Sequence, residues 1–476
     1  MNNTTKKTKI VATIGPATSS KEMLLKLVNA GVNVCRLNFS HGKHTDHAEV
    51  IKNIKEINAE HNLHIALLAD LQGPKIRIGE VENNHIEIKE NDEVVFTIKE
   101  CLGTNKKLYI NYIDLIKDVK VGEQILVNDG NMIFEVIKKV DSNEVLTKAK
   151  NDGVLSSNKG VNLPNTKLSL PSLTEKDLKD LDFVLKHKIE WIALSFVRTA
   201  RDIIELKHII ADKNHQAKVI AKIEKPQAIN DIEEIIKASD GIMVARGDLG
   251  VEMPMQEVPL LQKNIVKKSQ EFGKPVIIAT QMMESMITNI TPTRAEVNDV
   301  ANAVLDGADA LMLSGETSVG KYPIEVINSM CKIIKEIESH DNIYHVEQPP
   351  ETEHDRFITD SICFNACRLA HRTKASAIVT MTFSGYTAFK VSSCRPKAGI
   401  YVFTGNPDIL NTLSLVWGVK CFYYDKFVST DHTISDIKYL LKKNGLVKDN
   451  DLVINIASMP ISDKGQSNML KLSYVE

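Results

Sequence analysis

The sequence lacks any apolar stretch that approaches a membrane span, which needs about 20 consecutive apolar residues. Its first residues, MNNTTKKTK, also lack the apolar core of a secretory signal peptide. The seven cysteines include no pairs at metal-ligand spacing, and Cys363 and Cys367 are spaced to share one helix face. Such an odd, dispersed set predicts reduced thiols. We therefore expect a cytoplasmic protein with no membrane partner.

An excess of charge of either sign is also missing. The 59 basic and 61 acidic residues give a net charge of −2, so the composition does not favour binding to nucleic acid. What the chain does have is length. Its 476 residues are too many for one hydrophobic core, which predicts two or three domains.

A repeated unit of one short apolar strand followed by one helix begins near the N-terminus. Three strand-like runs, separated by helical patterns, cover residues 9–14, 32–39 and 65–70. The same rhythm resumes at a helix capped by Thr174, and five more runs follow at 191–196, 219–224, 241–245, 275–280 and 308–314. Eight parallel strands alternating with helices predict an α/β protein built on a (β/α)₈ TIM barrel. An open doubly wound sheet is the alternative.

Residues 76–165 interrupt this rhythm with a different period. Apolar and polar residues alternate there, and Asp129-Gly130 is typical of a tight hairpin turn. No long helical pattern appears in this stretch. We predict an inserted all-β domain after the third strand, a small barrel or sandwich.

The polar segment that starts at Tyr344 carries two prolines and predicts a linker. A further α/β unit follows it, with strands expected near 377–381, 399–404, 420–424 and 452–457. We expect a barrel domain made of two parts, residues 1–70 and 168–343. The inserted β domain should cover residues 71–167, and a C-terminal α/β domain with a candidate effector site should cover residues 344–476.

Charged side chains gather in the stretch 219–250. Lys222 and Glu224 are two residues apart on one expected strand and so share a face, while Asp248 follows the next strand. In parallel α/β folds, functional groups lie at the carboxyl ends of the strands. Two carboxylates there suit a divalent metal, and Lys222 adds a positive charge. A buried structural ion pair is the simpler alternative, but three charges at strand ends favour a site.

Eight segments together carry a family resemblance: KIVATIGPAT (9–18), CRLNFSHG (35–42), DLQGPKIR (70–77), KGVNLP (159–164), KIEKPQA (222–228), ARGDLG (245–250), ATQMMESM (279–286) and SGET (314–317). In order, and over essentially the whole chain, they resemble pyruvate kinase. The resemblance implies transfer of a phosphoryl group from phosphoenolpyruvate to ADP, giving pyruvate and ATP in the last step of glycolysis. It also implies Mg²⁺ or Mn²⁺ as cofactor, an inserted β domain that closes over ADP as a lid, and a homotetramer with allosteric control.

Carried over residue by residue, the resemblance assigns roles to matching positions. It implies catalytic roles for Lys222, Arg36 and Thr280. The substrate would be bound by Arg36, Lys222, Gly247, Asp248 and Thr280, the nucleotide by Asn38, Arg77 and Lys159, and the divalent metal by Glu224 and Asp248. Each assignment has a simpler alternative. Arg36 could pair with Asp70, Thr280 could cap a turn, and Arg77 and Lys159 could be solvated surface charges.

Many pyruvate kinases require K⁺, and the resemblance places its pocket at Asn38, Ser40, Asp70 and the carbonyl of Leu71. In K⁺-dependent members a Glu follows the proline of the Gly-Pro pair, whereas here Lys75 follows Pro74. Leu71, Gln72 and Ile78 depart from that branch in the same region. A lysine ammonium is a compact cation on a flexible stem, so we expect Lys75 to replace the monovalent ion and K⁺ not to be required.

In the C-terminal domain, the hydroxyl-rich turn after the first expected strand is where the family often binds a sugar phosphate. The candidate effector residues are Thr382, Ser384, Gly385 and Thr387. Phe383 and Tyr386 depart from the hydroxyl-rich pattern, so three interpretations stay open. The turn could bind a sugar phosphate, it could bind a nucleotide, or it could be an ordinary capped turn that binds no effector.

Two other functions compete with the kinase. A metal-dependent aldolase or lyase acting on oxo acids also needs carboxylates at strand ends, but it has no need for a lid or for Lys159. A scaffold protein that had lost its chemistry would have lost Lys222 or the carboxylates, and all three are intact.

Overall fold

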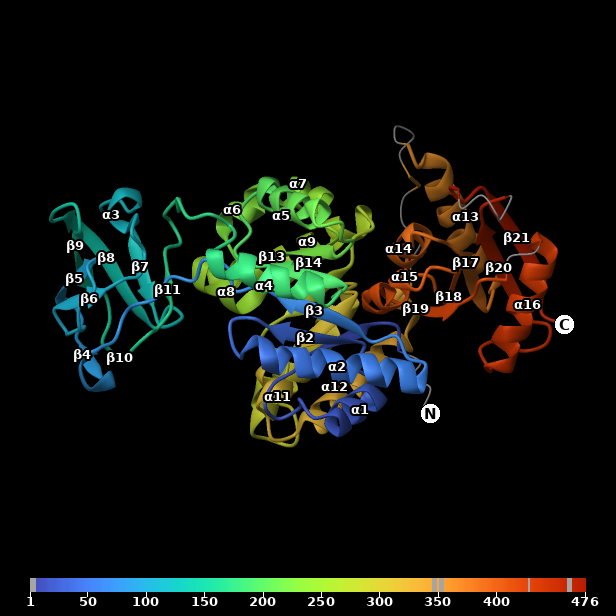
Figure 1. Ribbon diagram of the computed structural model, residues 1–476, viewed down its shortest axis with the longest axis horizontal. Coiled ribbons are helices and arrows are strands. Elements are labelled where there is room, and N and C mark those ends of the chain that lie inside the picture. Colours follow the sequence, from blue (N-terminus) through green and yellow to red (C-terminus); the bar gives the residue numbers. More distant parts are fainter. Residues whose placement is uncertain (1–5, 345–348, 351–354, 427–428, 460–464) are drawn as a thin grey trace.

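The computed structural model describes residues 6–344, 349–350, 355–426, 429–459 and 465–476. Three bodies lie in a row, with the β domain at one end, the barrel in the middle and the C-terminal domain at the other end (Figure 1). Most of the predicted linker after Tyr344 falls outside the described residues. In the part that is described, no helix is both long and apolar enough to cross a membrane.

The central body is a closed barrel of eight parallel strands, as predicted. The first strand pairs with both the second and the last, so the sheet has no free edge and the open-sheet alternative is wrong. The strands are β1 (Lys9–Thr13), β2 (Val34–Asn38), β3 (Ala66–Asp70), β12 (Trp191–Leu194), β13 (Lys218–Ile223), β14 (Gly241–Ala245), β15 (Val276–Ala279) and β16 (Ala310–Leu313). Several expected strands end earlier than predicted: β12 stops before Phe196 and β15 before Thr280.

The helices between these strands start at the capping residues that the sequence offers. Ser20 accepts a hydrogen bond from the Met23 N–H at the start of the first helix, and Thr174 forms a capping box with Asp177 at the start of α4. The principal barrel helices are α1 (Lys21–Ala30), α2 (His44–His61), α4 (Glu175–Lys186), α5 (Ala200–Asp212), α6 (Pro226–Asn230), α7 (Ile232–Ala238), α8 (Arg246–Glu252), α9 (Val258–Glu271), α10 (Arg294–Leu305), α11 (Gly315–Ser318) and α12 (Pro323–Glu338). After Pro226, the apolar spacing of Ile229, Ile232, Ile235 and Ile236 predicts one helix, but the structure divides it in two at Asp231.

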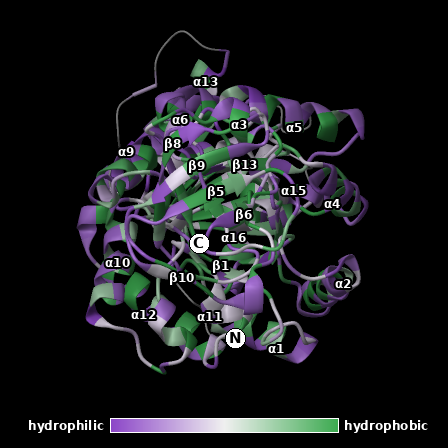
Figure 2. Ribbon diagram, turned by 90° about the vertical axis from the view of Figure 1, so that its left-hand side faces the viewer, coloured by the Kyte–Doolittle hydropathy of each residue, from purple (hydrophilic) through white to green (hydrophobic). Residues whose placement is uncertain are grey.

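The barrel strands are buried on both faces. One apolar cluster packs the strands against the helices, and another fills the interior with residues such as Val11, Leu68, Trp191 and Met243. This burial matches the continuous apolar strands of the sequence. Seen along the row of bodies with the β domain in front, green segments gather toward the middle of the view, and the outer helices show both green and purple stretches (Figure 2).

The insertion is all-β apart from short helical turns such as α3 (Leu115–Asp118). A six-stranded sheet has the order β11-β7-β8-β9-β5-β6, and β10 pairs with β4. Its strands are β4 (Ile86–Ile88), β5 (Glu93–Thr97), β6 (Lys107–Tyr109), β7 (Gln124–Val127), β8 (Met132–Lys139), β9 (Glu144–Ala149), β10 (Gly153–Leu155) and β11 (Val161–Asn162). Asp129, with φ of 54°, lies in the hairpin turn between β7 and β8, as its dipeptide predicted.

The C-terminal domain is a five-stranded sheet of order β19-β18-β17-β20-β21 with helices on its faces. It comprises α13 (Phe357–Thr373), β17 (Ala377–Met381), α14 (Tyr386–Ser393), β18 (Gly399–Thr404), α15 (Asp408–Thr412), β19 (Val419–Tyr423), α16 (Thr430–Lys443), β20 (Leu452–Ala457) and β21 (Met469–Tyr474). Four of these strands were predicted. The fifth, β21, is an antiparallel edge strand that the sequence analysis missed.

The C-terminal domain packs against the amino ends of the barrel strands. A short 3₁₀ turn, η5 (Leu413–Leu415), puts Leu415 into the interior cluster of the barrel. The indole N–H of Trp191, the first residue of β12, donates to the Thr412 carbonyl at 3.1 Å. This contact closes one end of the barrel and leaves the carboxyl ends of its strands facing the β domain (Figure 1).

Candidate active site

Lys222 lies at the centre of the charged group at the carboxyl ends of the strands. Its ammonium lies 2.9 Å from a Glu224 oxygen and 3.1 Å from an Asp70 oxygen, and it donates to the Ser195 hydroxyl at 2.7 Å. Lys222 is only 9% exposed and Glu224 only 1%. The predicted sharing of one face by Lys222 and Glu224 therefore appears as a direct ion pair.

Arg36 joins the same group from β2. Its Nε and Nη2 atoms both lie 2.7 Å from one Asp70 oxygen, and its Nη1 atom donates to the Thr13 hydroxyl at 2.8 Å. The pairing of Arg36 with Asp70, considered as a structural alternative, is thus present. It does not remove Arg36 from the mouth of the barrel, because Asp70 is also the partner of Lys222.

Burial and charge act in opposite directions on these groups. Burial alone would lower the pKa of Lys222, but Asp70 and Glu224 outweigh it and raise that pKa above its usual value. Burial alone would raise the pKa of Asp70, but Lys222 and Arg36 outweigh it and lower it. The pKa of Glu224 is raised by burial and by the neighbouring charge of Asp248. Glu224 and Asp248 are therefore close enough to repel each other.

The loop after β14 begins α8, so Gly247 and Asp248 lie in the first turn of a helix. Thr280 follows β15 with a φ of 69°, a left-handed conformation that is rare for a β-branched residue. Its hydroxyl accepts the Gly247 N–H at 2.8 Å and donates to the Ala279 carbonyl at 2.6 Å. The structure thus brings Gly247, Asp248 and Thr280 to adjacent strand ends, beside the Lys222 group.

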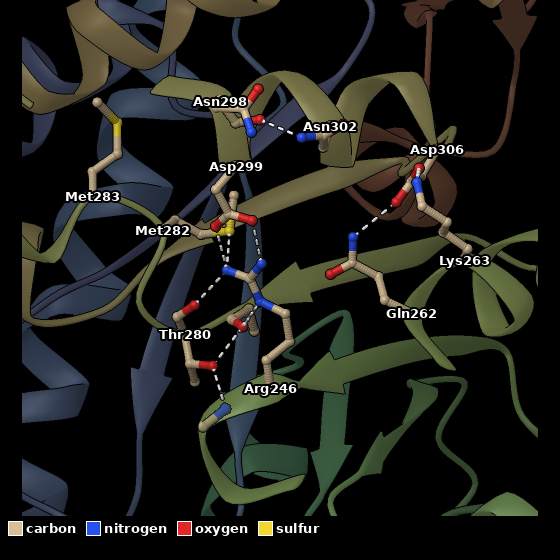
Figure 3. Close-up of polar contacts among 12 residues, drawn as sticks. Arg246, Gln262, Lys263, Thr280, Met282, Met283, Asn298, Asp299, Asn302 and Asp306 are labelled. Carbon is tan, nitrogen blue, oxygen red and sulfur yellow. Dashed lines mark hydrogen bonds and ion pairs between the residues drawn. The ribbon is translucent and has the colours of Figure 1, made fainter. Parts of the chain in front are cut away.

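Several polar residues at this mouth were not singled out from the sequence. Ser195 links Lys222 to the Leu71 carbonyl, to which its hydroxyl donates at 2.7 Å. Arg246 contacts the main chain of Thr280 and the carboxylate of Asp299 (Figure 3). Arg246 belongs to the segment ARGDLG, which is part of the family resemblance. Ser195 comes directly after the apolar strand β12, and Asp70 is the last residue of the apolar strand β3. Those two placements were signals that could have found them.

A divalent cation fits the donor set only with help from water or substrate. Glu224 and Asp248 offer carboxylate oxygens, the ligand type that Mg²⁺ prefers. Among the residues that the structure describes, no group of three or more His, Cys, Asp or Glu side chains could hold a metal. Mg²⁺ commonly binds through one or two carboxylates and keeps other positions for water and phosphate, so this pair is compatible with it.

Three residues of the expected monovalent-cation pocket, Asn38, Ser40 and Asp70, lie close together at the ends of β2 and β3. Asn38 and Asp70 are partners in the β2–β3 pairing, and the Asn38 side-chain oxygen accepts the Ser40 N–H at 3.1 Å. Lys75 is exposed, and its side chain lies close to Gly160, where the chain leaves the β domain. It lines a cleft between barrel and β domain together with Asp248.

Arg77 and Lys159 lie where the chain enters and leaves the β domain. Arg77 forms an isolated antiparallel bridge with Gly160, and its Nη1 atom donates to the Asn158 carbonyl at 2.8 Å. The Lys159 carbonyl accepts the Ile78 N–H at 2.9 Å. The entering and leaving segments are therefore paired. The cleft between barrel and β domain is lined by their neighbours Lys75 and Gly160 and not by Arg77 or Lys159.

The candidate effector turn borders a cavity of about 610 Å³ in the C-terminal domain. Gly385, with φ of 83°, precedes α14, and its N–H donates to the Thr382 hydroxyl at 3.1 Å. Ser384 accepts the Tyr386 N–H at 3.4 Å, and the hydroxyls of Thr387 and Ser467 are 3.0 Å apart. Thr382, Ser384 and Thr387 all line the cavity, so the turn faces a space large enough for a small ligand.

Comparison with known families covers nearly the whole chain. A model described as "Pyruvate kinase, barrel domain" matches residues 5–327, and one described as "Pyruvate kinase, alpha/beta domain" matches residues 360–473. With the closed barrel and its charged mouth, these matches define the chain as a phosphotransferase. It belongs to the pyruvate kinase family.

The individual relatives match nearly the whole length of this chain. The chain is 44% identical to a pyruvate kinase of Geobacillus stearothermophilus, over 99% of this chain and 80% of that protein. It is 40% identical to one of Clostridium acetobutylicum, over 99% of this chain and 100% of that protein. A crystal structure of a pyruvate kinase from Cryptosporidium parvum superposes with a TM-score of 0.93 at 34% identity, covering 100% of this chain and 98% of that one.

Proposed function

We propose that the protein transfers the phosphoryl group of phosphoenolpyruvate to ADP, giving pyruvate and ATP. The observation that carries the proposal is the position of Lys222, held between Asp70 and Glu224 beside Arg36 at the carboxyl end of the barrel. Phosphoryl transfer passes through a loose transition state that needs positioning and positive charge more than covalent help. Two fixed cations in a nearly dry site provide the positioning, and together with a bound divalent cation they would provide the net positive charge.

The proposed roles follow from where each group lies. Arg36 holds the phosphate with a planar fork, and Lys222 stabilises the charge on the group in transfer. The backbone N–H groups at Gly247 and Asp248 receive the substrate carboxylate in the first turn of α8, and for this the Gly247 N–H exchanges the Thr280 hydroxyl for the substrate. Thr280 lies on the route by which the electron-rich enolate gains its proton on one face. Glu224 and Asp248 hold Mg²⁺ or Mn²⁺, which when bound adds positive charge beside the phosphate.

The β domain is proposed to act as a lid over ADP. Asn38, Arg77 and Lys159 are the nucleotide-contacting residues in this view, and the last two lie on the paired segments where the chain enters and leaves the domain. A closing lid would exclude water, which would otherwise compete with ADP for the phosphoryl group.

Lys75 is proposed to make K⁺ unnecessary. The pocket of Asn38, Ser40, Asp70 and the Leu71 carbonyl would otherwise hold the monovalent ion. Lys75 is exposed, and it is on the segment that leads from this pocket into the β domain. Its long stem gives it the reach to bring a positive charge toward bound substrate.

The C-terminal cavity is proposed to bind a sugar phosphate or nucleotide effector. Thr382, Ser384, Gly385 and Thr387 supply hydroxyls and a backbone N–H at the start of α14. The Tyr386 ring, which lies 4.2 Å from the Arg356 guanidinium carbon, adds an aromatic surface to the same cavity.

The assembly is proposed to be a cytoplasmic homotetramer with dihedral symmetry, a common arrangement for oligomeric enzymes. Sedimentation at working concentration measures this directly, and a monomer would contradict it.

The test of the activity is formation of ATP from phosphoenolpyruvate and ADP by the purified protein. We expect turnover only with Mg²⁺ or Mn²⁺ present. An aldolase or lyase would instead cleave oxo acids without any nucleotide, so cleavage of such substrates in the absence of ADP would support that alternative.

A further inference from the structure

The backbone after β15 adopts an unusual conformation. Thr280 and Gln281 are consecutive non-glycine residues with φ of 69° and 53°. Left-handed backbone is disfavoured for a β-branched residue, and it persists only where surrounding groups hold it in place. Since the Thr280 hydroxyl points from this turn toward the loop of Gly247, the groups that hold the turn also fix the hydroxyl.

Arg246 is the side chain that holds the turn. Its Nη2 atom donates to the Thr280 carbonyl at 2.8 Å, and its Nε atom donates to the Ala279 carbonyl at 3.3 Å. Arg246 is also the first residue of α8, whose next residue, Gly247, donates its N–H to the Thr280 hydroxyl. One guanidinium therefore joins the loop that carries Asp248 to the loop that carries Thr280.

Asp299 on α10 fixes this guanidinium. Its two oxygens lie 2.6 Å from Nη1 and 2.7 Å from Nη2 of Arg246, a two-pronged pairing with a defined orientation (Figure 3). The two side chains are 15% and 32% exposed, so water screens the pair only in part.

The helix that carries Asp299 is itself attached to the segment after β15. Glu296, one turn earlier on the same face of α10, accepts the N–H of Ser285 at 2.7 Å and its hydroxyl at 2.6 Å. Asp299 therefore extends from a helix whose own position is set relative to the turn that it supports.

We propose that Asp299 is a positioning residue for the reaction, acting through Arg246 to set the Thr280 hydroxyl. The proposal rests on the proposed role of Thr280 in the proton route to the enolate. In that step an O–H bond of a water bound to the Thr280 hydroxyl breaks, and its proton forms the new C–H bond with the electron pair of the enolate double bond. The enolate oxygen becomes the ketone carbonyl and the hydroxide returns to solvent, so a Thr280 hydroxyl out of place slows the step. Without the Asp299 carboxylate, the guanidinium can rotate, the Thr280 carbonyl loses its donor, and the left-handed turn relaxes.

The first experiment compares Asp299→Asn with a matched control on the same helix. Asp306, which follows the last residue of α10, pairs with Lys263 and accepts the Gln262 amide at 2.9 Å, and none of these touches the Thr280 turn (Figure 3). We expect Asp299→Asn to lower kcat about 10- to 100-fold with a small change in KM for ADP, because a misplaced group costs rate more than binding. Asp306→Asn should retain wild-type kcat.

A double-mutant cycle separates positioning from a general structural effect. In a Thr280→Ala background there is no hydroxyl left to position, so adding Asp299→Asn should cause no further loss of kcat. Two losses that multiply would show that Asp299 does not act through Thr280, and the proposal would be wrong. Incorporation of solvent deuterium into the methyl group of pyruvate, measured with Mg²⁺ and ATP, should fall in parallel with kcat for Asp299→Asn and be normal for Asp306→Asn.

Conservative variants keep the proposal testable if Asp299→Asn fails to fold. Asp299→Glu keeps the charge and should recover part of kcat, while Arg246→Lys keeps a cation but loses the fork and should reproduce the loss. Wild-type kcat in Arg246→Lys would overturn the proposal. A wild-type protein that forms no ATP would instead refute the proposed function. An active wild type with an unimpaired Thr280→Ala variant would remove Thr280 from the mechanism, and Asp299 with it.

Discussion

Four ionised side chains at the mouth of the barrel are almost closed to solvent. Arg36 and Lys222 are 8% and 9% exposed, and Asp70 and Glu224 are each 1% exposed. Charges buried in this way are tolerated when they are paired. Two cations balance two carboxylates, so these four groups carry no surplus positive charge. An anionic substrate would therefore gain most when a divalent cation arrives with it, which is a physical reason for the proposal that Glu224 and Asp248 hold one.

Replacing Lys222 by Met tests the central charge. We expect turnover to fall by about two to three orders of magnitude or more, because a fixed charge aimed at the group in transfer is lost. The free energy of unfolding should also fall, by about 3–5 kcal/mol, since Glu224 loses its cation. Steady-state rates and urea unfolding measure both effects. Lys263→Met, which removes a surface lysine, is the control, and near-native turnover in Lys222→Met would remove Lys222 from the mechanism.

Lys75 is the residue that we propose to decide the monovalent-cation requirement. We expect full activity in tetramethylammonium or Tris buffer without K⁺, and partial K⁺ dependence in Lys75→Glu, because the fixed ammonium is replaced by a carboxylate. The measurement is turnover against KCl at constant ionic strength, since screening alone changes the kinetics of charged sites. Saturable activation of the wild type by K⁺, absent with the control salt, would contradict the idea.

At the scale of the elements, local patterns predicted most of the fold. The order of the barrel strands and the place of the β insertion follow from hydrophobic period, which neighbouring residues determine. The break at Asp231 and the edge strand β21 were missed, because the first is a small change inside one helical pattern and the second has a mixed burial pattern. The sequence also indicated Lys222 and Glu224 correctly as neighbours, since residues two apart on a strand share a face.

The supporting contacts of the site could not be predicted in the same way. Arg246 and Asp299 are 53 residues apart, and no local pattern states that they meet. The left-handed turn at Thr280 has no glycine to mark it. The sequence therefore predicted which charged groups gather at the mouth of the barrel, while the groups that fix their positions depend on tertiary packing.

The η5 turn closes the amino end of the barrel, and Leu415 is its fully buried contact with the interior. We expect Leu415→Ala to lower the free energy of unfolding by about 2–5 kcal/mol, through lost burial and the cavity that remains. The activity should persist, because the site lies at the opposite end of the strands. Urea unfolding and kcat measure the two effects. Leu102→Ala, at a position 57% exposed, should change stability by less than about 0.5 kcal/mol. A comparable loss in both variants would contradict this account.

At the scale of the whole molecule, one buried and one partly buried lysine of the N-terminal segment, Lys9 and Lys7, join the barrel to the C-terminal domain. Lys7 donates to the Pro396 and Ala398 carbonyls at 2.9 and 2.8 Å, and Lys9 donates to the Val419 carbonyl at 2.8 Å. Burial lowers the pKa of Lys7 to about 8 and that of Lys9 to about 7. The contact between the two domains thus contains ammonium groups held mainly by neutral carbonyl oxygens, which makes it sensitive to pH.

The lowered pKa of Lys9 determines the direction in which the free energy of unfolding changes with pH. Burial lowers its pKa from 10.5 to about 7, so at lower pH the folded state carries the full cost of a buried ammonium. Above that pH the folded state has released the proton and the unfolded state still binds it, so the contribution of Lys9 to the free energy of unfolding rises with pH.

Comparing wild type with Lys9→Met isolates this contribution from those of other titrating groups, such as the cysteines. We expect the stability of wild type relative to Lys9→Met to increase steadily from about pH 6 to pH 9, because the variant has no proton to release at this position. Urea midpoints at several pH values measure the difference. Lys26→Met removes an exposed lysine of α1, and its stability difference from wild type should stay nearly constant over the same range. A constant difference for Lys9→Met as well would show that the Lys9 ammonium stays protonated inside the domain contact, stabilised by the Val419 carbonyl more than burial opposes it.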